Sequence, residues 1–522
     1  MRDFQKPGRS GVYARNGMCA TSHPLAAKVA VQMLEAGGNA LDAAIAGGVL
    51  LNICEPMMTG LAGDCFALVS EPGQPVVAVN GSGRAPQGLD AEALRAKGPT
   101  MPVYDVDAVT VPGAIDAFCK MSERWGRMSL GDVLAPAVYY AEAGVPVGPR
   151  SAHDWARATH LKGAAQRFFT NDGKPLGIGD VFTALGQAEV LRQIAVDGRA
   201  AFYEGEIAED MVQSLQALGG SHTMADFAAV ETEFSSPVTG RYGGHELLEH
   251  PPNGQGAAAI LLLNILSHFD LPGLDPLGAE RAHLEAEATK LAYDARNRFI
   301  ADPDQTARLE HMLAPETAAG LAKLIRKDAV LPQSPPGAEE VHRDTVYITV
   351  VDGAGMAVSL IYSIFHAFGS GLASDKFGLL FQNRGAGFTL EPGHPNEAGP
   401  GKRPMHTIIP GMLAREGRVM MPFGVMGGQY QCTGHARLVS NLLDYGMDVQ
   451  AAIDAPRLFA ENGRLTLERG FAPEVAQALS ELGHDVVMAE TPLGGAQAIR
   501  MHEGRVLEGG SDPRKDGCAL GY

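Results

Sequence analysis

The sequence predicts a mixed α/β (α+β) protein, and two kinds of segment carry that prediction. Helix-like segments fill the beginning and the middle of the chain, whereas β-branched runs follow one another after residue 345. The 522 residues are 45% hydrophobic and 20% charged, which is ample material for a large core. Length alone favours several domains, but single α/β domains can also reach this size.

The first expected helix begins near Pro24, in SHPLAAKVAVQMLEAGG, because proline suits a first helical turn and Gly37-Gly38 suits a helix end. A second helix, NALDAAIAGGVLLNIC, is apolar nearly all round. We therefore expect it to be deeply buried, with its glycine pair allowing close packing. Strand-like runs CFALVS and PVVAVN follow the loop EPMMTGLAGD, and the region from about 110 to about 330 is expected to be mainly helical.

The segment 331–344, LPQSPPGAEEVHRD, is polar and proline-rich, which predicts an exposed linker. Directly after it, TVYITVV, the turn DGAG and MAVSLIYSI predict a β-hairpin. Further strands are expected in GRLTLERG and AQAIRMHEGRVLEGG, and a helix in APEVAQALSELG. Thr345 therefore opens a strand immediately after a linker.

Charge and composition exclude several classes of partner. The formal net charge of −18 repels phosphate, so neither nucleic acid nor an anionic membrane is an expected partner. The start of the chain lacks the apolar core of a signal peptide, and no run of about 20 apolar residues is present. Six scattered cysteines without a CxxC pair predict reduced, mostly buried thiols in a cytoplasmic protein.

The commoner catalytic motifs are missing from the sequence. There is no GxSxG elbow, HExxH pair or GxxxxGK[ST] loop, and FGSG and FGVMGGQ lack the context of a dinucleotide site. His283 and Glu287 lie one helical turn apart, a spacing that suits two metal ligands. Because the sequence suggests no third ligand nearby, a solvated helix face is expected there and no metal site is predicted.

Thr345 is a candidate nucleophile because of its position. An N-terminal threonine carries its own base, the α-amine, whose pKa of roughly 7.7–8 leaves a useful neutral fraction near pH 7. To expose that amine, Thr345 must attack the carbonyl of Asp344, and water must then hydrolyse the resulting ester. The alternative is that Thr345 is simply a strand-forming residue.

Motifs along nearly the whole chain resemble one known family. The segment DTVYITVVDGAGMAVSLIYSIFHAFGSG is similar to the start of that family's small subunit, and the alignment needs no gap from Thr345 to Gly371. Further motifs follow in the same order: AGGNALDAAIA, TVPGAIDAF, LAPAVYYAEAG, LAYDARNRFIADPD, FGVMGGQ, DYGMDVQAAIDAPRLF and GGSDPRKDGCALGY. Together they are similar to the γ-glutamyltransferase family of N-terminal-nucleophile hydrolases, which are made as zymogens and cleave themselves.

The resemblance implies a fold and a set of catalytic residues. The implied fold is a four-layer αββα sandwich, cut into residues 1–344 and 345–522, which stay associated as a heterodimer or as a dimer of heterodimers. Thr345 would be the nucleophile, and Asp344–Thr345 the processed bond. Ser363 would orient the amine, and the backbone of Gly427 and Gly428 would hold the oxyanion, although two glycines also suit a plain tight turn. No metal or organic cofactor is implied.

Three departures from the family pattern concern the substrate. Gly387 in QNRGAGF stands where the family has an acid for the glutamyl amine, and Ser82 in NGSGRAP stands where it has an arginine. His406-Thr407 replaces a serine pair that contacts the α-carboxylate. A site without a counter-charge for the ammonium group discriminates against γ-glutamyl substrates. These departures resemble a branch with oxamate amidohydrolase and the cephalosporin-acylase-like proteins.

The resemblance to that branch suggests residues for a simple carboxylate. Arg384 and His406 are the first candidates, with Asn383 and Thr407 beside them and Arg84 as a second arginine. Two alternatives stay open. Arg384 either binds the substrate or pins its own loop, and His406 is either a ligand or a packing histidine.

Three functions are compatible with the sequence. The favoured one is an amidohydrolase that cleaves a small carboxylate-bearing amide such as oxamate, or an acyl amide, through an acyl-enzyme. The second is a genuine γ-glutamyltransferase or glutathione hydrolase. The third is an uncleaved binding protein without catalytic activity.

Overall fold

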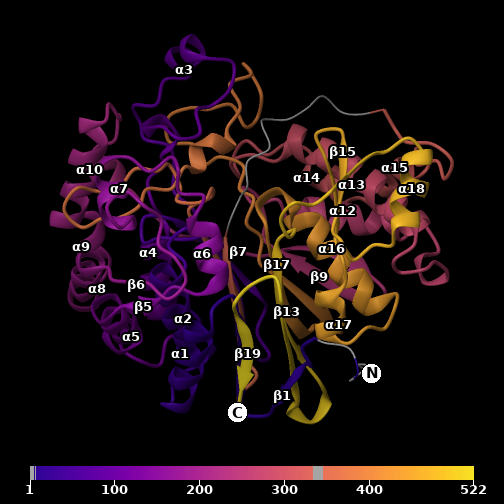
Figure 1. Cartoon of the computed structure of the whole chain (residues 1–522), viewed down its shortest axis with the longest axis horizontal. Helices are drawn as coiled ribbons and strands as arrows, with labels where there is room; N and C mark the ends of the chain where they lie inside the picture. The colour runs from indigo at the N-terminus through magenta and orange to yellow at the C-terminus, as the bar shows by residue number, and fades with distance from the viewer. Residues whose placement is uncertain (1–4, 6–7, 333–344) are drawn as a thin grey trace.

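The computed structural model describes residue 5 and the ranges 8–332 and 345–522. Two seven-stranded antiparallel sheets lie at the centre, between helices on either side (Figure 1). The first sheet has the order β19 (Cys518–Gly521), β2 (Gly17–Thr21), β10 (Val346–Asp352), β11 (Ala357–Ser363), β3 (Asp64–Ser70), β4 (Val77–Gly81) and β7 (Glu233–Ser235). The second has the order β1 (Val12–Ala14), β18 (Leu507–Ser511), β17 (Gly495–Met501), β13 (Arg418–Met426), β12 (Gly411–Arg415), β9 (His245–Glu249) and β8 (Val238–Tyr242).

Helices cover the outer face of each sheet, as the helices on the two sides of Figure 1 show. The first side holds α1 (Pro24–Glu35), α2 (Ala40–Cys54), α4 (Ala114–Trp125), α5 (Leu130–Ala143), α6 (Pro149–Trp155), α7 (Gly163–Phe169), α8 (Leu185–Asp197), α9 (Arg199–Tyr203) and α10 (Glu206–Ala217). The second side holds α12 (Gly256–Leu266), α13 (Ala279–Phe299), α14 (Leu309–Leu313), α15 (Pro315–Ala322), α16 (Gln431–Leu443), α17 (Val449–Asp454) and α18 (Pro473–Glu481). This is the expected four-layer αββα sandwich.

Smaller elements complete the fold. They are α3 (Ala91–Lys97), α11 (Met224–Ala228), the pair β5 (Val145–Pro146) and β6 (Val181–Phe182), and a three-stranded sheet of β14 (Leu458–Glu461), β15 (Arg464–Leu467) and β16 (Asp485–Met488). Among the described residues, no helix is long and apolar enough to cross a membrane. All six cysteines are free and five of them are buried, as expected.

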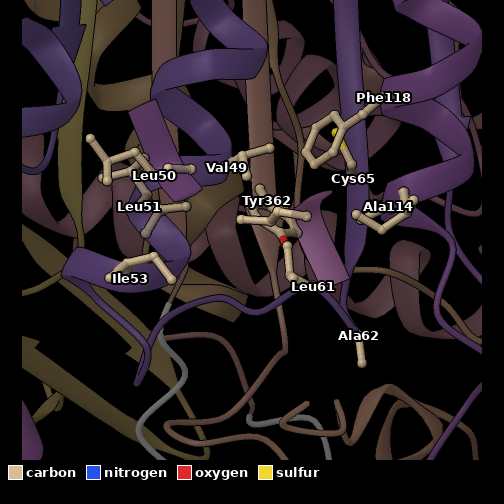
Figure 2. Close-up of a cluster of buried hydrophobic side chains, with 14 of the residues drawn as sticks. Val49, Leu50, Leu51, Ile53, Leu61, Ala62, Cys65, Ala114, Phe118 and Tyr362 are labelled. Atoms are coloured by element: carbon tan, nitrogen blue, oxygen red, sulfur yellow. The ribbon is translucent and has the colours of Figure 1, made fainter. Parts of the chain in front are cut away.

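Helix α2 anchors the first helical layer. The Asn39 side chain accepts hydrogen bonds from the backbone N–H groups of Leu41 and Asp42, and the Asp42 carboxylate accepts one from the Asn39 backbone N–H, so a capping box starts the helix. Every residue of α2 is buried, which confirms the prediction from its apolar sequence. Figure 2 shows this core, in which α2 side chains lie with Phe118 of α4 and Tyr362 of β11.

The region from about 110 to about 330 is mainly helical, as expected, but two details differ from the sequence analysis. Strands β7, β8 and β9 interrupt the region that was expected to be mainly helical. Strand β8, VTGRY, contains a glycine and an arginine and lies at a sheet edge, so its local pattern is weak and its pairing with β9 decides its structure.

The expected solvated helix face at His283 and Glu287 is also wrong, because both side chains are completely buried. Other elements pack against two sides of helix α13. One side packs in a cluster with α12, and Ala282 and Ala286 on another side pack against β14, β15 and α18.

The glycine pair in α2 gives a matched stability test. A Cβ atom on Gly47 would lie 2.6 Å from Ile348 Cδ1 of β10, whereas a Cβ on Gly48 would meet no atom closer than 3.7 Å. Alanine improves helix propensity equally at both sites, so we expect Gly48→Ala to raise or keep the thermal midpoint. Gly47→Ala should destabilise the protein by about 1–3 kcal/mol through overpacking against the central sheet. Equal shifts in thermal denaturation for the two variants would contradict this packing.

Candidate active site

Thr345 lies at the start of a central strand, and it is 2% exposed. Strand β10 pairs with β2 on one side and β11 on the other, and Thr21 of β2 donates a hydrogen bond to the Tyr347 carbonyl at 2.8 Å. The hairpin register pairs Val346 with Tyr362, so the next pair outward is Thr345 and Ser363. Their hydroxyl oxygens lie 3.2 Å apart.

Ser363 links Thr345 to a buried arginine. The Phe365 N–H donates to Ser363 Oγ at 2.9 Å, and Arg384 Nη2 donates to the same oxygen at 3.2 Å. Two donors at the oxygen's lone pairs favour the Ser363 hydroxyl as the donor toward Thr345. A donor at Thr345 Oγ1 stabilises negative charge on that oxygen when its own proton is removed.

Arg384 is fully buried at the start of the 3₁₀ turn η3 (Arg384–Gly387). Its Nη1 donates to Thr407 Oγ1 at 3.1 Å, and its guanidinium lies 4.1 Å from the centre of the Phe365 ring. Phe365 has φ of 80°, a region that bulky residues rarely adopt. Such a conformation persists only when its surroundings enforce it, and here it accompanies the stacking of the ring on the arginine.

A second buried ionisable residue, Asp64, interacts with the positive charge of Arg384. Its Oδ1 accepts hydrogen bonds from Gly83 N, Gly113 N and Gln382 Nε2, at 2.9, 3.3 and 3.0 Å. Burial raises the pKa of Asp64 to about 6, while the positive charge of Arg384 and these hydrogen bonds oppose that rise. Asp64 was missed by the sequence analysis, and its only sequence signal is a single acid at the head of the apolar run CFALVS.

His406 is fully buried, and its side chain contacts Asp64. Its Nε2 lies 3.1 Å from Asp64 Oδ2, and its Nδ1 accepts a long hydrogen bond from Ile408 N at 3.4 Å, so the ring proton belongs on Nε2. Burial, reinforced by the charges of Arg384 and His250, holds the pKa of His406 well below its usual range. His406 is therefore a neutral donor to Asp64.

The Gly427–Gly428 turn follows β13 and lies near the start of β10. Met426 shares a buried cluster with Tyr347 and Ile408, and a Cβ on Gly424 would clash with the Tyr347 ring. Gly427 and Gly428 have φ of 121° and 57°, and a Cβ on Gly427 would approach Gly494 Cα to 2.9 Å. Gly427 therefore requires glycine, and the left-handed φ of Gly428 favours it.

Gln255 fixes the backbone of this turn. Its Nε2 donates to the Thr407 carbonyl at 2.6 Å and to the Gly428 carbonyl at 3.2 Å, and Arg296 donates to its Oε1 at 2.7 Å. The Tyr430 N–H donates to the Gly427 carbonyl at 3.1 Å, which fixes the peptide plane that carries the Gly428 N–H, and a fixed N–H direction is what an oxyanion site requires.

The remaining candidates from the sequence lie elsewhere or play other parts. Asn383 is buried and uses its amide on backbone, accepting from His366 N and donating to the Val103 carbonyl. Arg84 pairs with Asp302 at 3.1 Å and with Glu233 at 3.2 Å, outside the group around Thr345. Asp344 lies outside the described residues.

A cavity of about 830 Å³ opens beside this group. The cavity wall includes two residues that contact Arg384, Phe365 and Thr407, and Gly387 of the same 3₁₀ turn. Gln429 and His366 also line it. Thr407 both lines the cavity and accepts a hydrogen bond from Arg384. A small molecule in this cavity would reach the residues that connect to Thr345 through Ser363.

Known proteins resemble this chain over nearly its whole length. The family described as gamma-glutamyltranspeptidase matches residues 26–522. A glutathione hydrolase-like YwrD proenzyme of Bacillus subtilis is 36% identical, covering 97% of this chain and 98% of the relative. An oxamate amidohydrolase proenzyme of Klebsiella pneumoniae is 34% identical, with the same coverage of both chains. The crystal structure of a cephalosporin acylase from Bacillus halodurans superimposes with a TM-score of 0.93 at 38% identity, covering 100% of this chain and 99% of that one.

The raised pKa of Asp64 predicts how stability depends on pH. Because its folded-state pKa of about 6 exceeds the ordinary value of 3.8, its contribution to stability is fully present below about pH 4 and is lost as pH rises through 6. The neutral variant Asp64→Asn lacks this dependence. Between about pH 4 and pH 7 we therefore expect the wild type to lose about 2–3 kcal/mol of unfolding free energy relative to Asp64→Asn.

The measurement is chemical denaturation of both proteins across that pH range. All other titrating groups are common to the two proteins, so the difference between them isolates Asp64. A constant difference across the range would show that Asp64 does not titrate there.

Proposed function

The chain belongs to the gamma-glutamyltranspeptidase family and is a hydrolase, and from this premise we propose that Thr345 is its self-generated nucleophile. Processing begins with attack of Thr345 Oγ1 on the Asp344 carbonyl, which moves the acyl group from nitrogen to oxygen. Water hydrolyses the resulting ester and leaves a free amine on Thr345. The named relatives are proenzymes, which supports processing of this kind.

In the processed enzyme, we propose that the Thr345 amine takes the proton of its own hydroxyl as that oxygen attacks an amide carbonyl. The Ser363 contact at 3.2 Å supports this step, because a donor at Oγ1 favours its deprotonated form. Gly427 and Gly428 would donate their N–H groups to the oxyanion. The leaving amine then takes the proton from the Thr345 ammonium, and water hydrolyses the acyl-enzyme.

Arg384 carries the proposal for the substrate. Ser363 Oγ lies 3.2 Å from Thr345 Oγ1 and also accepts a hydrogen bond of 3.2 Å from the Arg384 guanidinium. Two hydrogen bonds therefore connect the guanidinium to the nucleophile. A substrate carboxylate held there would be close to the scissile carbonyl. In oxamate the carboxylate is bonded directly to the amide carbonyl, whereas in a γ-glutamyl group three carbons separate the α-carboxylate from the γ-carbonyl. This geometry supports a short carboxylate-bearing amide, the substrate named for the Klebsiella relative.

We also propose that residues 1–344 and 345–522 stay together as a heterodimer after cleavage. Strands β10 and β11 of the second segment lie between β2 and β3 of the first, so separating the segments would break the centre of a sheet. The six free cysteines favour a reducing compartment, which supports the expectation of a cytoplasmic enzyme.

A threonine replacement tests processing. We expect the purified wild type to yield two fragments on a denaturing gel, the smaller beginning at Thr345 by N-terminal sequencing. Thr345→Ala should give one uncut chain without activity, because alanine has no hydroxyl. The control is Thr349→Ala, another buried threonine of β10 whose hydroxyl bonds the Val358 carbonyl at 2.9 Å. Cleavage in Thr345→Ala, or an uncut wild type after long incubation, would refute the proposal.

A replacement of Arg384 separates its two possible roles. If it binds the substrate carboxylate, Arg384→Gln should raise KM for oxamate about tenfold to a hundredfold, the effect of losing a charge-assisted hydrogen bond. The KM for a neutral acyl anilide should then change little, and its kcat should fall only through the lost contact with Ser363. If Arg384 only pins its loop, both substrates should suffer equally. Rapid turnover of a γ-glutamyl anilide with a dipeptide acceptor by the wild type would instead identify a transferase.

A further inference from the structure

A buried group of metal-binding side chains lies apart from Thr345. His283 and Glu287 occupy successive turns of α13, and His484 lies between α18 and β16. One donor atom from each of the three side chains lies within 4.8 Å of the other two. The sequence suggested no third ligand because His484 is 197 residues from Glu287 and only the fold brings it there.

The donor spacings bracket those of a tetrahedral zinc site. Zinc bonds of about 2.0–2.1 Å place neighbouring donor atoms about 3.3 Å apart. His283 Nδ1 and His484 Nε2 are 2.8 Å apart, and His484 Nε2 and Glu287 Oε1 are 3.9 Å apart. Shifts of about half an ångström would bring these two pairs to that spacing, and the donor atoms of Glu287 and His283 lie within 4.8 Å of each other.

Outer hydrogen bonds already orient two of the ligands. His283 Nε2 lies 2.6 Å from the Arg326 carbonyl and must donate to it, so Nδ1 of this ring presents a lone pair to the group. Glu287 Oε2 accepts from Leu331 N at 2.7 Å, which leaves Oε1 facing the histidines. Partners of this kind, a carbonyl behind a histidine and a donor behind a carboxylate, are typical of protein metal sites.

One cation already competes for the group. The Lys290 ammonium pairs with Glu287 Oε1 and also donates to the Leu331 carbonyl at 3.3 Å. Lys290 and His484 both line the large cavity, so the ammonium can swing into that space and an ion can enter from it. A divalent ion would replace a single charge by a double one at the same carboxylate.

We propose that His283, Glu287 and His484 bind a divalent transition metal ion of the zinc class, with a fourth position open to the cavity. Binding requires the His484 proton to move from Nε2 to Nδ1 and the Lys290 ammonium to leave, with no other change in protonation. Two ligands come from residues 1–344 and one from 345–522, so the ion would connect the two segments. Only that consequence rests on the proposed cleavage, and the binding itself does not.

Zinc binding to the metal-stripped full-length protein tests the proposal. We expect one equivalent of Zn²⁺ to bind in competition with a chelating dye and to raise the thermal midpoint. Co²⁺ should show the visible absorption of a four-coordinate site. His484→Gln, which keeps a donor for His283 but is a poor zinc ligand, should lose both signals. Lys290→Met should tighten binding roughly tenfold by removing the competing ammonium.

Controls separate this site from surface binding and from catalysis. His268→Ala removes an exposed histidine and should leave zinc binding unchanged. Thr345→Ala should bind zinc as the wild type does, even though it is uncut and inactive. Circular dichroism of His484→Gln confirms that it folds. Zinc binding by His484→Gln equal to that of the wild type, or no stoichiometric binding by the wild type and Lys290→Met, would overturn the proposal.

Discussion

The position of β10 in the middle of a sheet is the constraint on which the rest of the structure depends. Its backbone pairs with β2 and β11, its outer face packs on α2, and its inner face meets the second sheet at Tyr347 and Gly424. A strand held on all four sides has a fixed register. That register places Thr345 opposite Ser363, so the geometry of the candidate nucleophile follows from the packing of the core rather than from a flexible loop.

The polar group behind Thr345 shows how charges are accommodated at such depth. A buried guanidinium without a counter-charge would cost several kcal/mol. Here Arg384 is balanced electrostatically by Asp64, which is itself bound by two backbone N–H groups, Gln382 and His406. The segments that hold these residues begin β3 and follow β11, and both strands lie beside β10 or its partner. The sheet order therefore brings these two groups together as well as the candidate nucleophile.

Local sequence patterns were sufficient to predict the helices and strands that bury a continuous apolar run. Helix α2 was predicted from its apolar sequence, and the β10–β11 hairpin from β-branched runs on either side of a glycine-containing turn. Asp64 and His484 were beyond such reasoning, since a single acid or histidine acquires its role only from partners far along the chain. Strand β8 was missed for the same reason, and the burial of His283 follows from packing on both sides of α13.

The balance between Arg384 and Asp64 has a consequence for any anionic substrate. A carboxylate that binds Arg384 brings a second negative charge to a guanidinium that already faces one. The two anions repel each other, so occupancy of the site favours the protonated form of Asp64, whose pKa of about 6 is within reach of ordinary conditions. By reciprocity, protonation of Asp64 favours substrate binding. If Arg384 binds the substrate as proposed, the buried carboxyl at the head of β3 would tie recognition of a carboxylate to proton uptake, through a residue that need not touch the substrate.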